Sequence, residues 1–184
     1  MPGILLIAAG KGERYRAAGG KGEKLMAPLS AHHGRPLFSV VLETAIASQL
    51  PIHIVTRPDN IPIIQLAADN GIAVTLLNSQ SMGESIAAGV KATDDWDGWL
   101  IQPADMPEIT VRDYHRIVQA LQHSSQARLY WQEQPGHPVG FSQQWRDALC
   151  QLCNEEGAKN VINHSLLRLN GHPGVVIDRD FPEE

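Results

Sequence analysis

The chain has 184 residues, of which 43% are hydrophobic and 19% are charged, as is typical of a folded globular protein. Its formal net charge of −5 argues against a general nucleic-acid binder and against a membrane-surface binder. No segment approaches the roughly 18 apolar residues of a membrane span, and we expect no signal peptide. Two cysteines, Cys150 and Cys153, cannot form a disulfide framework, so we expect a reducing, cytoplasmic setting.

Predicted strands and helices alternate through the first two-thirds of the chain. Residues 4–7 are apolar without polar alternation, which is typical of a strand covered on both faces. The pattern then predicts helices over 36–49, 60–70, 82–93 and 111–122, and strands over 52–55, 72–77 and 99–101. This alternation favours a mostly parallel sheet with helices on both faces.

The last third of the chain is richer in strands. We predict strands over 128–131 and 138–141 around a short connection, helices over 143–152 and 156–163, and short strands over 166–169 and 175–177. These strands should add both parallel and antiparallel pairings at one edge of the sheet. No internal repeat or long linker interrupts the chain, so residues 1–184 are predicted to form a single domain.

A Gly-rich basic loop follows the first strand, and its small residues are Ala8, Ala9, Gly10 and Gly12. Ligands of open α/β sheets bind at the carboxyl ends of the strands, and small residues let the backbone approach a ligand. Lys11 and Arg14 add positive charge, which favours a small anionic ligand. An ordinary strand-to-helix turn is the alternative, because a lone Gly-x-Gly is a weak signal. Residues 15–24 continue as a polar, Gly-rich stretch that we expect to be mobile.

Carboxylates follow two of the predicted strands. Asp105 comes just after the strand over 99–101, where it would suit Mg²⁺, an ion that prefers oxygen ligands. Capping of the helix that begins near Val111 is the alternative role. Asp178 and Asp180 follow the strand predicted over 175–177, although a solvated acidic tail would look the same. Two carboxylates from distant segments could share one Mg²⁺ bound to a triphosphate, with Asp180 the preferred second ligand and Asp178 the alternative.

The stretch from Ser81 to Val90 opens a predicted helix. Ser81 could be the N-cap residue, with Glu84 completing a capping box. That interpretation leaves the small residues Gly83 and Ser85 unexplained. Backbone N–H groups at the helix start could instead bind a nucleotide sugar or phosphate.

Two further motifs are weaker. His137, within Gly136-His137-Pro138-Val139, belongs either to a turn or to a surface that faces an acceptor substrate. The two cysteines are spaced like a zinc or redox pair, but no second Cys/His pair completes a zinc site. Packing within a helix is therefore the favoured role of Cys150 and Cys153.

Taken together, the motifs resemble the MobA-like nucleotidyltransferases, most closely the molybdenum cofactor cytidylyltransferase branch. The residues that carry the resemblance are Leu6 to Arg14, Lys24-Leu25, Gly34 to Leu37, Met82-Gly83-x-Ser85 with Gly89, Ala104 to Pro107, Gly136 to Val139 and the terminal Asp178-x-Asp180-x-Pro182. The resemblance implies an α/β fold of the nucleotide-diphospho-sugar transferase type, a three-layer α/β/α Rossmann-like sandwich. This agrees with the strand and helix pattern.

The resemblance also implies an activity, the Mg²⁺-dependent transfer of CMP from CTP to the terminal phosphate of molybdopterin, with release of pyrophosphate. The product would pass to a molybdoenzyme or its chaperone. The triplet Ala8-Ala9-Gly10 tends to accompany cytidine use in this family. Alternatives are GTP with molybdopterin, another phosphorylated acceptor such as methylerythritol phosphate or a sugar phosphate, and a non-catalytic nucleotide- or cofactor-binding protein.

The implied site follows from the same motifs. Arg14, Lys24 and Asp105 would carry catalysis, and Asp105 and Asp180 would hold Mg²⁺. His137 would face the acceptor. The stretch between Arg14 and Lys24 is longer than is usual in the family, so Lys21 is an alternative to Lys24. The nucleotide would be bound by Ala8, Ala9, Gly10, Gly12, Arg14, Lys24, Met82, Ser85 and Asp105.

Overall fold

The computed structural model describes residues 1–183, and its main element is a seven-stranded sheet in the order β5-β4-β1-β6-β8-β7-β9. The strands of this sheet are β1 (Gly3–Ala8), β4 (Ile52–Thr56), β5 (Ala73–Leu76), β6 (Gly98–Pro103), β7 (Gln126–Trp131), β8 (Gln134–Ser142) and β9 (Leu166–Asn170). A small second sheet pairs β2 (Pro28–Leu29) with β3 (Arg35–Pro36). The helices are α1 (Glu13–Ala17), α2 (Leu37–Ala47), α3 (Ile61–Asp69), α4 (Met82–Lys91), α5 (Val111–Ala120) and α6 (Arg146–Cys150).

The first strand is the centre of the parallel part of the sheet. Ile4, Leu5 and Leu6 are fully buried, which confirms a strand covered on both faces. β1 pairs in parallel with β4 on one side and with β6 on the other. The chain runs outward from β1 through β4 to β5 and then returns to β6, so the strand order reverses between β1 and β6. This reversal marks the place where an open α/β sheet binds its ligands.

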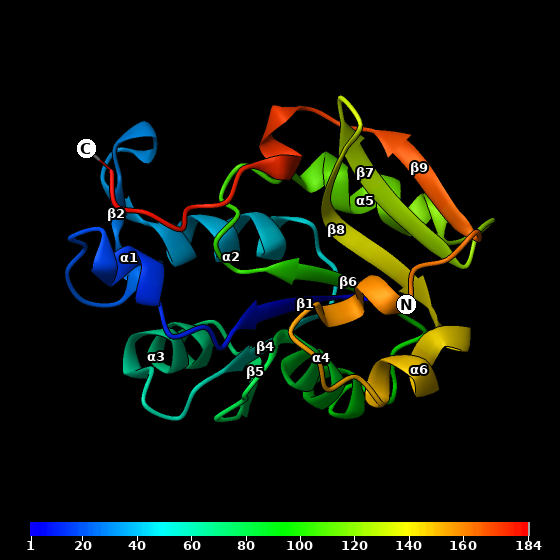
Figure 1. Ribbon diagram of the computed structural model, residues 1–184, viewed down its shortest axis with the longest axis horizontal. Coiled ribbons are helices and arrows are strands. Elements are labelled where there is room, and N and C mark those ends of the chain that lie inside the picture. The colour runs from blue at the N-terminus through cyan, green and yellow to red at the C-terminus, as the bar shows by residue number, and fades with distance from the viewer. Residues whose placement is uncertain (184) are drawn as a thin grey trace.

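Helices cover both faces of the sheet (Figure 1). One hydrophobic cluster joins the alternate β1 residues Ile4 and Leu6 to α2, α3 and α5. The other joins Leu5 and Ile7 to α4 and α6. Because neighbouring residues of a strand point to opposite faces, one apolar run serves both clusters. The predicted α/β/α layering is therefore confirmed.

The far half of the sheet is mixed, as predicted. β8 is antiparallel to both β6 and β7, and β9 is parallel to β7. β7 and β8 form the expected pair of strands around a short connection, in which Gln132 and Glu133 have positive φ angles. Since β8 runs against β6, the start of β8 lies at the sheet edge where β6 ends.

Two predicted elements near the C-terminus are wrong. Residues 175–177 do not form a strand but lie at the end of a 3₁₀ helix, Pro173–Val176. Val175 is fully buried because it packs against Gly136 of β8, so its apolar character reflects a docked turn. The helix predicted over 156–163 is only the 3₁₀ turn Gly157–Asn160, since Gly157 adopts a positive φ of 63° that interrupts a regular helix.

The Gly-rich stretch after β1 is more regular than expected. Its first part forms the short helix α1, which begins after Gly12 in the left-handed conformation, with φ 67°. Tyr15 is buried, and its ring lies against Gly20, where an added Cβ would stand 2.3 Å from the ring. Tyr15 thus anchors the stretch over residues 15–24, which the sequence predicted to be mobile. The helix predicted over 143–152 is likewise shorter, with a 3₁₀ turn over Gln143–Trp145 before α6.

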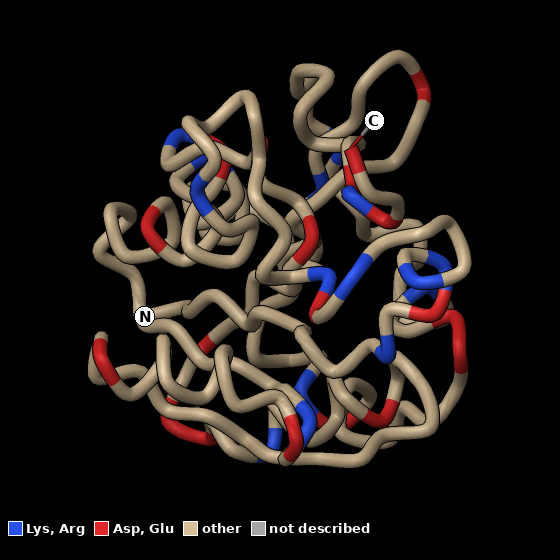
Figure 2. Tube along the Cα trace, turned by 90° about the vertical axis from the view of Figure 1, so that its left-hand side faces the viewer, with Lys and Arg blue, Asp and Glu red and all other residues tan. Residues whose placement is uncertain are grey.

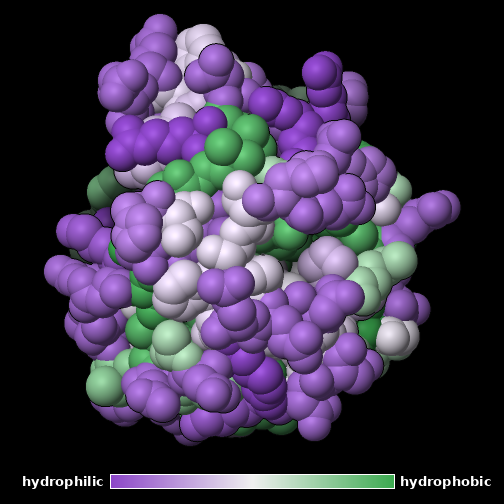
Figure 3. All heavy atoms as spheres, turned by 90° about the vertical axis from the view of Figure 1, so that its right-hand side faces the viewer, coloured by the Kyte–Doolittle hydropathy of each residue, from purple (hydrophilic) through white to green (hydrophobic). Residues whose placement is uncertain are grey.

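Basic and acidic residues are interspersed along the chain on the side on which the C-terminal segment lies (Figure 2). On the opposite side, apolar atoms show between polar side chains, mainly in recesses (Figure 3). None of the helices within residues 1–183 has the length and apolarity that crossing a membrane requires.

The start of α4 provides a test of the packing. An added Cβ on Gly83 would lie 2.7 Å from backbone atoms of Asn154. Because backbone cannot move aside as a side chain can, we expect Gly83→Ala to lower the free energy of unfolding by about 1–3 kcal/mol. Gly10→Ala is the control, since its Cβ would meet no atom within 4 Å. Urea denaturation of both variants measures the effect, and equal stabilities would contradict this packing.

Candidate functional site

Three distant segments meet where β1 and β6 end. Lys24, on the 3₁₀ turn Lys24–Met26, donates hydrogen bonds to Oδ2 of Asp105 at 2.9 Å and to Oδ1 of Asp180 at 3.0 Å. Asp105 follows β6, and Asp180 lies in the C-terminal segment. The side chains of Lys24 and Asp105 are 17% and 13% exposed, so this ion pair is largely shielded from solvent. The site therefore depends on one ammonium group that joins two carboxylates.

The C-terminal segment is fixed across this edge by further contacts. Arg14 of α1 donates to Oδ2 of Asp180 at 3.1 Å. The backbone N–H of Arg179 donates to the carbonyl of Asp105 at 2.9 Å. Farther along, the backbone N–H of Ser30 donates to the carboxylate of Glu183 at 3.0 Å. Glu184, the last residue of the acidic run, lies outside the described residues.

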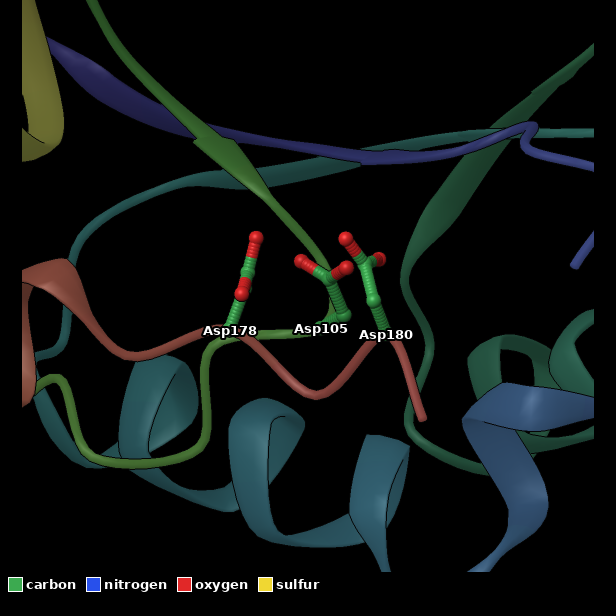
Figure 4. A group of neighbouring side chains, drawn as sticks. All are labelled: Asp105, Asp178 and Asp180. Atoms are coloured by element: carbon green, nitrogen blue, oxygen red, sulfur yellow. The ribbon is translucent and has the colours of Figure 1, made fainter. Parts of the chain in front are cut away.

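Three carboxylates form a cluster suited to a divalent cation. Oxygen atoms of Asp105, Asp178 and Asp180 lie within 4.8 Å of one another. Figure 4 shows the three side chains next to each other, Asp105 from the end of β6 and the other two from the C-terminal segment. Oδ1 of Asp105 is buried and has no hydrogen-bond partner among the described residues, so it can act as a ligand. Carboxylate oxygens are the ligands that Mg²⁺ and Mn²⁺ prefer, and these residues therefore fit such an ion. Both Asp178 and Asp180 belong to the cluster.

Burial and charge act in opposite directions on these groups. Burial raises the pKa of Asp105, against the opposing attraction of Lys24. For Asp180 the effect of burial is outweighed by the hydrogen bond and charge of Lys24, which lower its pKa. Burial also disfavours the Lys24 ammonium, but the two carboxylates outweigh burial and raise the Lys24 pKa. The cluster thus stabilises a cation at its centre.

A cavity of about 480 Å³ opens beside the ion pairs, within the size range of small-molecule sites. Among the residues expected from the sequence, it is lined by Ala9, Gly10, Gly12, Arg14, Lys24, Met82, Ser85 and Asp180. Ile7 and Ala9 belong to the same hydrophobic cluster as Met82 and α4. The cavity therefore lies on the α4 side of the sheet, between the Gly-rich loop and the start of α4.

The N-terminus of α4 is capped by the protein itself. Ser81 Oγ accepts from the backbone N–H of Glu84 at 3.1 Å, and the Gly83 N–H donates to the Asn154 carbonyl at 2.8 Å. The Glu84 carboxylate bonds to the Gln80 N–H, so the capping box is shifted by one residue. Because these amides have partners, capping is favoured over anion binding by the helix start. Ser85 is buried, and its hydroxyl shares a hydrogen bond with the Ser79 hydroxyl, at 2.7 Å.

Some of the expected residues lie beside the cavity rather than in it. Ala8 is buried below the loop, and its carbonyl accepts from the Thr56 hydroxyl at 2.9 Å. Asp105 lies behind Lys24 and does not line the cavity, nor does it cap α5, whose N-cap residue is Thr110. Lys21 is exposed, whereas Lys24 bonds to the carboxylates, so the geometry favours Lys24 over Lys21.

His137 lies at the same sheet edge, one strand farther from the cavity. Val139 is opposite Ile101, so continuing the antiparallel register brings His137 opposite Pro103, two residues before Asp105. Its side chain shares the face of Val139, which is the α4 and α6 side. His137 is therefore next to the end of β6 but is not among the residues that line the cavity.

Arg128 was not among the site residues predicted from the sequence. It is opposite Val139 in the sheet and thus shares the face of His137. Arg128 is partly buried, and its Nε donates to the Gly136 carbonyl at 2.7 Å. Burial lowers the pKa of Arg128, which indicates a guanidinium that lacks full compensation of its charge. An arginine within an apolar strand pattern was the available signal. Further lining residues that were not expected are Glu13, Tyr15, Ser79, Gln80 and Glu155.

Comparison with known proteins identifies the family. The model of the MobA-like NTP transferase domain matches residues 4–170. The chain belongs to this family. No curated protein matches the sequence.

Several solved structures share the fold of this chain. Rv0371c from Mycobacterium tuberculosis H37Rv has a TM-score of 0.81 at 16% identity, covering 98% of this chain and 92% of that one. Its complex with manganese has a TM-score of 0.74 at 15% identity, covering 93% and 89%. The 4-diphosphocytidyl-2C-methyl-D-erythritol synthase from Anaerococcus prevotii has a TM-score of 0.70 at 13% identity, covering 96% and 91%. The chain is thus a MobA-like nucleotidyltransferase with the nucleotide-diphospho-sugar transferase fold.

The surroundings of His137 in this MobA-like chain predict a pH dependence of stability. Burial, with a smaller effect of the Arg128 charge, lowers the pKa of His137 to about 3. Between this value and the ordinary pKa near 6.5, the unfolded chain binds a proton that the folded chain does not. His137 therefore makes the free energy of unfolding fall as the pH falls from about 6.5.

We expect His137→Gln to reduce this dependence of the free energy of unfolding on pH between pH 6.5 and 4.5. The reduction should correspond to the loss of up to one proton bound on unfolding, as measured by urea denaturation at each pH. Above pH 7.5 the slopes of the two proteins should coincide, because both side chains are neutral there. Parallel curves through the acidic range would contradict the buried neutral imidazole.

Proposed function

We propose that this MobA-like nucleotidyltransferase moves CMP from CTP to the terminal phosphate of molybdopterin. The observation that carries the proposal is the meeting of Lys24, Asp105 and Asp180 beside a cavity walled by the Gly-rich loop. This arrangement joins a cationic side chain and a candidate metal cluster to a space of the size a nucleotide needs. Arg14 lies at the mouth of the same cavity and adds a second positive charge.

The chemistry asks little of the protein beyond positioning and charge. A phosphate oxygen of the acceptor attacks the α-phosphorus of CTP and forms a new P–O bond. The bond from that phosphorus to the bridging oxygen breaks, and pyrophosphate leaves with the electron pair. Because the acceptor phosphate is already an anion, no strong base is required. Lys24 and Arg14 neutralise the negative charge of the triphosphate, and Gly10 and Gly12 let the backbone come close to it.

Asp105, Asp178 and Asp180 are the residues that would hold Mg²⁺, or Mn²⁺ in its place. Such an ion, when bound, neutralises charge on the triphosphate and helps to orient it. The nucleoside would lie over Met82 and Ser85, which line the α4 side of the cavity. A cytoplasmic setting, where CTP is available, is part of this proposal, and transfer of the product to a molybdoenzyme or its chaperone is the expected next step.

The acceptor would approach from the β8 side, where His137 and Arg128 share one face. An anionic acceptor is favoured there because Arg128 is partly buried, and its hydrogen bond within the described chain goes to a backbone carbonyl rather than to a carboxylate. The neutral imidazole of His137 can add one hydrogen bond. Nucleotide and acceptor would then meet above the end of β6.

A second candidate is transfer of CMP to methylerythritol phosphate. Its support is the fold shared with 4-diphosphocytidyl-2C-methyl-D-erythritol synthase. Incubation with each of the four NTPs, Mg²⁺ and molybdopterin, followed by pyrophosphate detection, separates the candidates. Release with CTP alone supports the first proposal, and release with GTP indicates a guanylyltransferase. Turnover only with another phosphorylated acceptor excludes molybdopterin, and absence of binding by any NTP excludes a nucleotidyltransferase role.

Asp105 is the first residue to test. We expect Asp105→Asn to lower kcat about 10²–10³-fold, the usual cost of losing one preorganised electrostatic contact. Folding should persist, because asparagine keeps the shape of the side chain. Asp97→Asn is the matched control, as Asp97 comes just before the other end of β6 and bonds to the N-terminal amine. Full activity of Asp105→Asn, measured as pyrophosphate release, refutes the proposed role.

Arg128 tests the acceptor side. We expect Arg128→Ala to raise KM for molybdopterin about 10- to 100-fold, the range of a lost charged hydrogen bond, without changing KM for CTP. Arg168→Ala is the control, because Arg168 is opposite Arg128 on β9 but exposed, with its guanidinium 4.8 Å from the Tyr130 ring. Equal effects of the two substitutions would exclude a specific role for Arg128.

A further inference from the structure

The ammonium of Lys24 already occupies the carboxylate cluster. Its two partners, at 2.9 and 3.0 Å, are Asp105 and Asp180, which are also two of the three candidate metal ligands. A divalent cation ligated by the same oxygens would stand within a few ångströms of the ammonium, at ligand distances of about 2.0–2.2 Å. At that separation two positive charges repel strongly. Lys24 and a metal ion thus compete for the same two carboxylate groups.

We propose that Lys24 is the resident counter-ion of the cluster and must leave Asp105 and Asp180 before a divalent cation can bind there. Released in this way, the ammonium becomes available to the phosphates of the nucleotide. This second step rests on the proposed function, whereas the exchange itself does not. Lys24 therefore couples the metal site to the nucleotide site.

The structure provides a route for the exchange. Lys24 lines the cavity as well as touching the carboxylates, so its side chain spans the two sites. The turn that carries it is held in place by buried Leu25, whose N–H donates to the Glu23 carboxylate at 3.3 Å. A fixed turn and a flexible side chain let the ammonium move by rotation about its own bonds, without a shift of the backbone.

The exchange has a thermodynamic consequence. A free divalent ion must displace Lys24 without giving it a new partner, so the ion binds weakly. An ion that enters together with a triphosphate provides that partner. Nucleotide and metal therefore strengthen each other's binding by the same factor, since such coupling is reciprocal. The Lys24 ammonium therefore keeps the cluster from binding a metal ion when no nucleotide is present.

The alternative is that Lys24 stays in place and a metal ion uses other oxygens. Within residues 1–183, Asp105 Oδ1 is buried without a hydrogen-bond partner and Asp178 is not bonded to Lys24, so these carboxylate oxygens are not engaged by the ammonium. In that case Lys24 would support the cluster by holding Asp180, and its removal would not improve metal binding. The two arrangements thus predict opposite effects of the same substitution.

The test is Mn²⁺ binding to the whole chain in the absence of nucleotide, with free Mn²⁺ measured by electron paramagnetic resonance. We expect Lys24→Met to bind Mn²⁺ at least about tenfold more tightly than the native chain, and Lys24→Arg to remain weak because it keeps the cation. Lys21→Met is the matched control, since it removes the same charge from an exposed position of the same loop. Its affinity should change less than about twofold, because exposed charges are screened. Lys24→Met that binds no more tightly than Lys21→Met overturns the proposal.

A second measurement needs no substitution. Acetic anhydride labels exposed amines, and mass spectrometry compares the labelling of Lys24 with that of Lys21 in the native chain. Saturating Mg²⁺ should increase the labelling of Lys24 and leave Lys21 unchanged, and no increase at Lys24 also overturns the proposal. Neither experiment contains CTP or an acceptor, so failure of the proposed nucleotidyl transfer leaves both results interpretable.

Discussion

The structure of the site depends on one ammonium group placed between two carboxylates. Lys24 comes from the segment after the first strand, Asp105 from the end of β6 and Asp180 from the last residues of the chain. Each of these groups would be costly to bury alone, and together they compensate one another. The contact therefore fixes where the Gly-rich loop and the C-terminal segment lie on the sheet edge.

That contact is possible because of the strand order. The return of the chain from β5 to β6, beside β1, brings residues about a hundred positions apart to one edge. The apolar sequence of β1 makes this order favourable, since a strand buried on both faces belongs in the middle of a sheet. Thr56 at the end of β4 donates to the Ala8 carbonyl, so the loop leaves the sheet from a firmly bonded end. Packing, in this way, determines where the charges meet.

Much of this could be predicted from the sequence. Uninterrupted apolar runs predicted β1 and β6, and helical spacing predicted α2 and α5. Both patterns are local because they reflect which side chains of an element are buried. Asp105 stood out because it follows a buried strand at the same sheet edge as the Gly-rich loop, although helix capping would have placed a carboxylate there as well. The C-terminal part could not be predicted equally well. Val175 is buried by a docked 3₁₀ turn, and an apolar pair does not distinguish a turn from a short strand.

The choice between Lys21 and Lys24 shows the other limit. Both lysines belong to a polar, Gly-rich stretch, and a basic residue at either position suits an anionic ligand equally well. What separates them is the packing of Leu25 beside Lys24, which holds the second lysine against the sheet edge.

Arg128 is a related case, because its partial burial and its hydrogen bond to the Gly136 carbonyl depend on how β7 pairs with β8, which its local sequence does not reveal. In both cases a charge is partly buried by contacts that form only when the chain folds. Charges of this kind are poorly compensated by solvent, so they interact strongly with an ion or an anionic ligand. The tertiary packing that sequence patterns do not reveal therefore also determines how strongly these residues interact at the site.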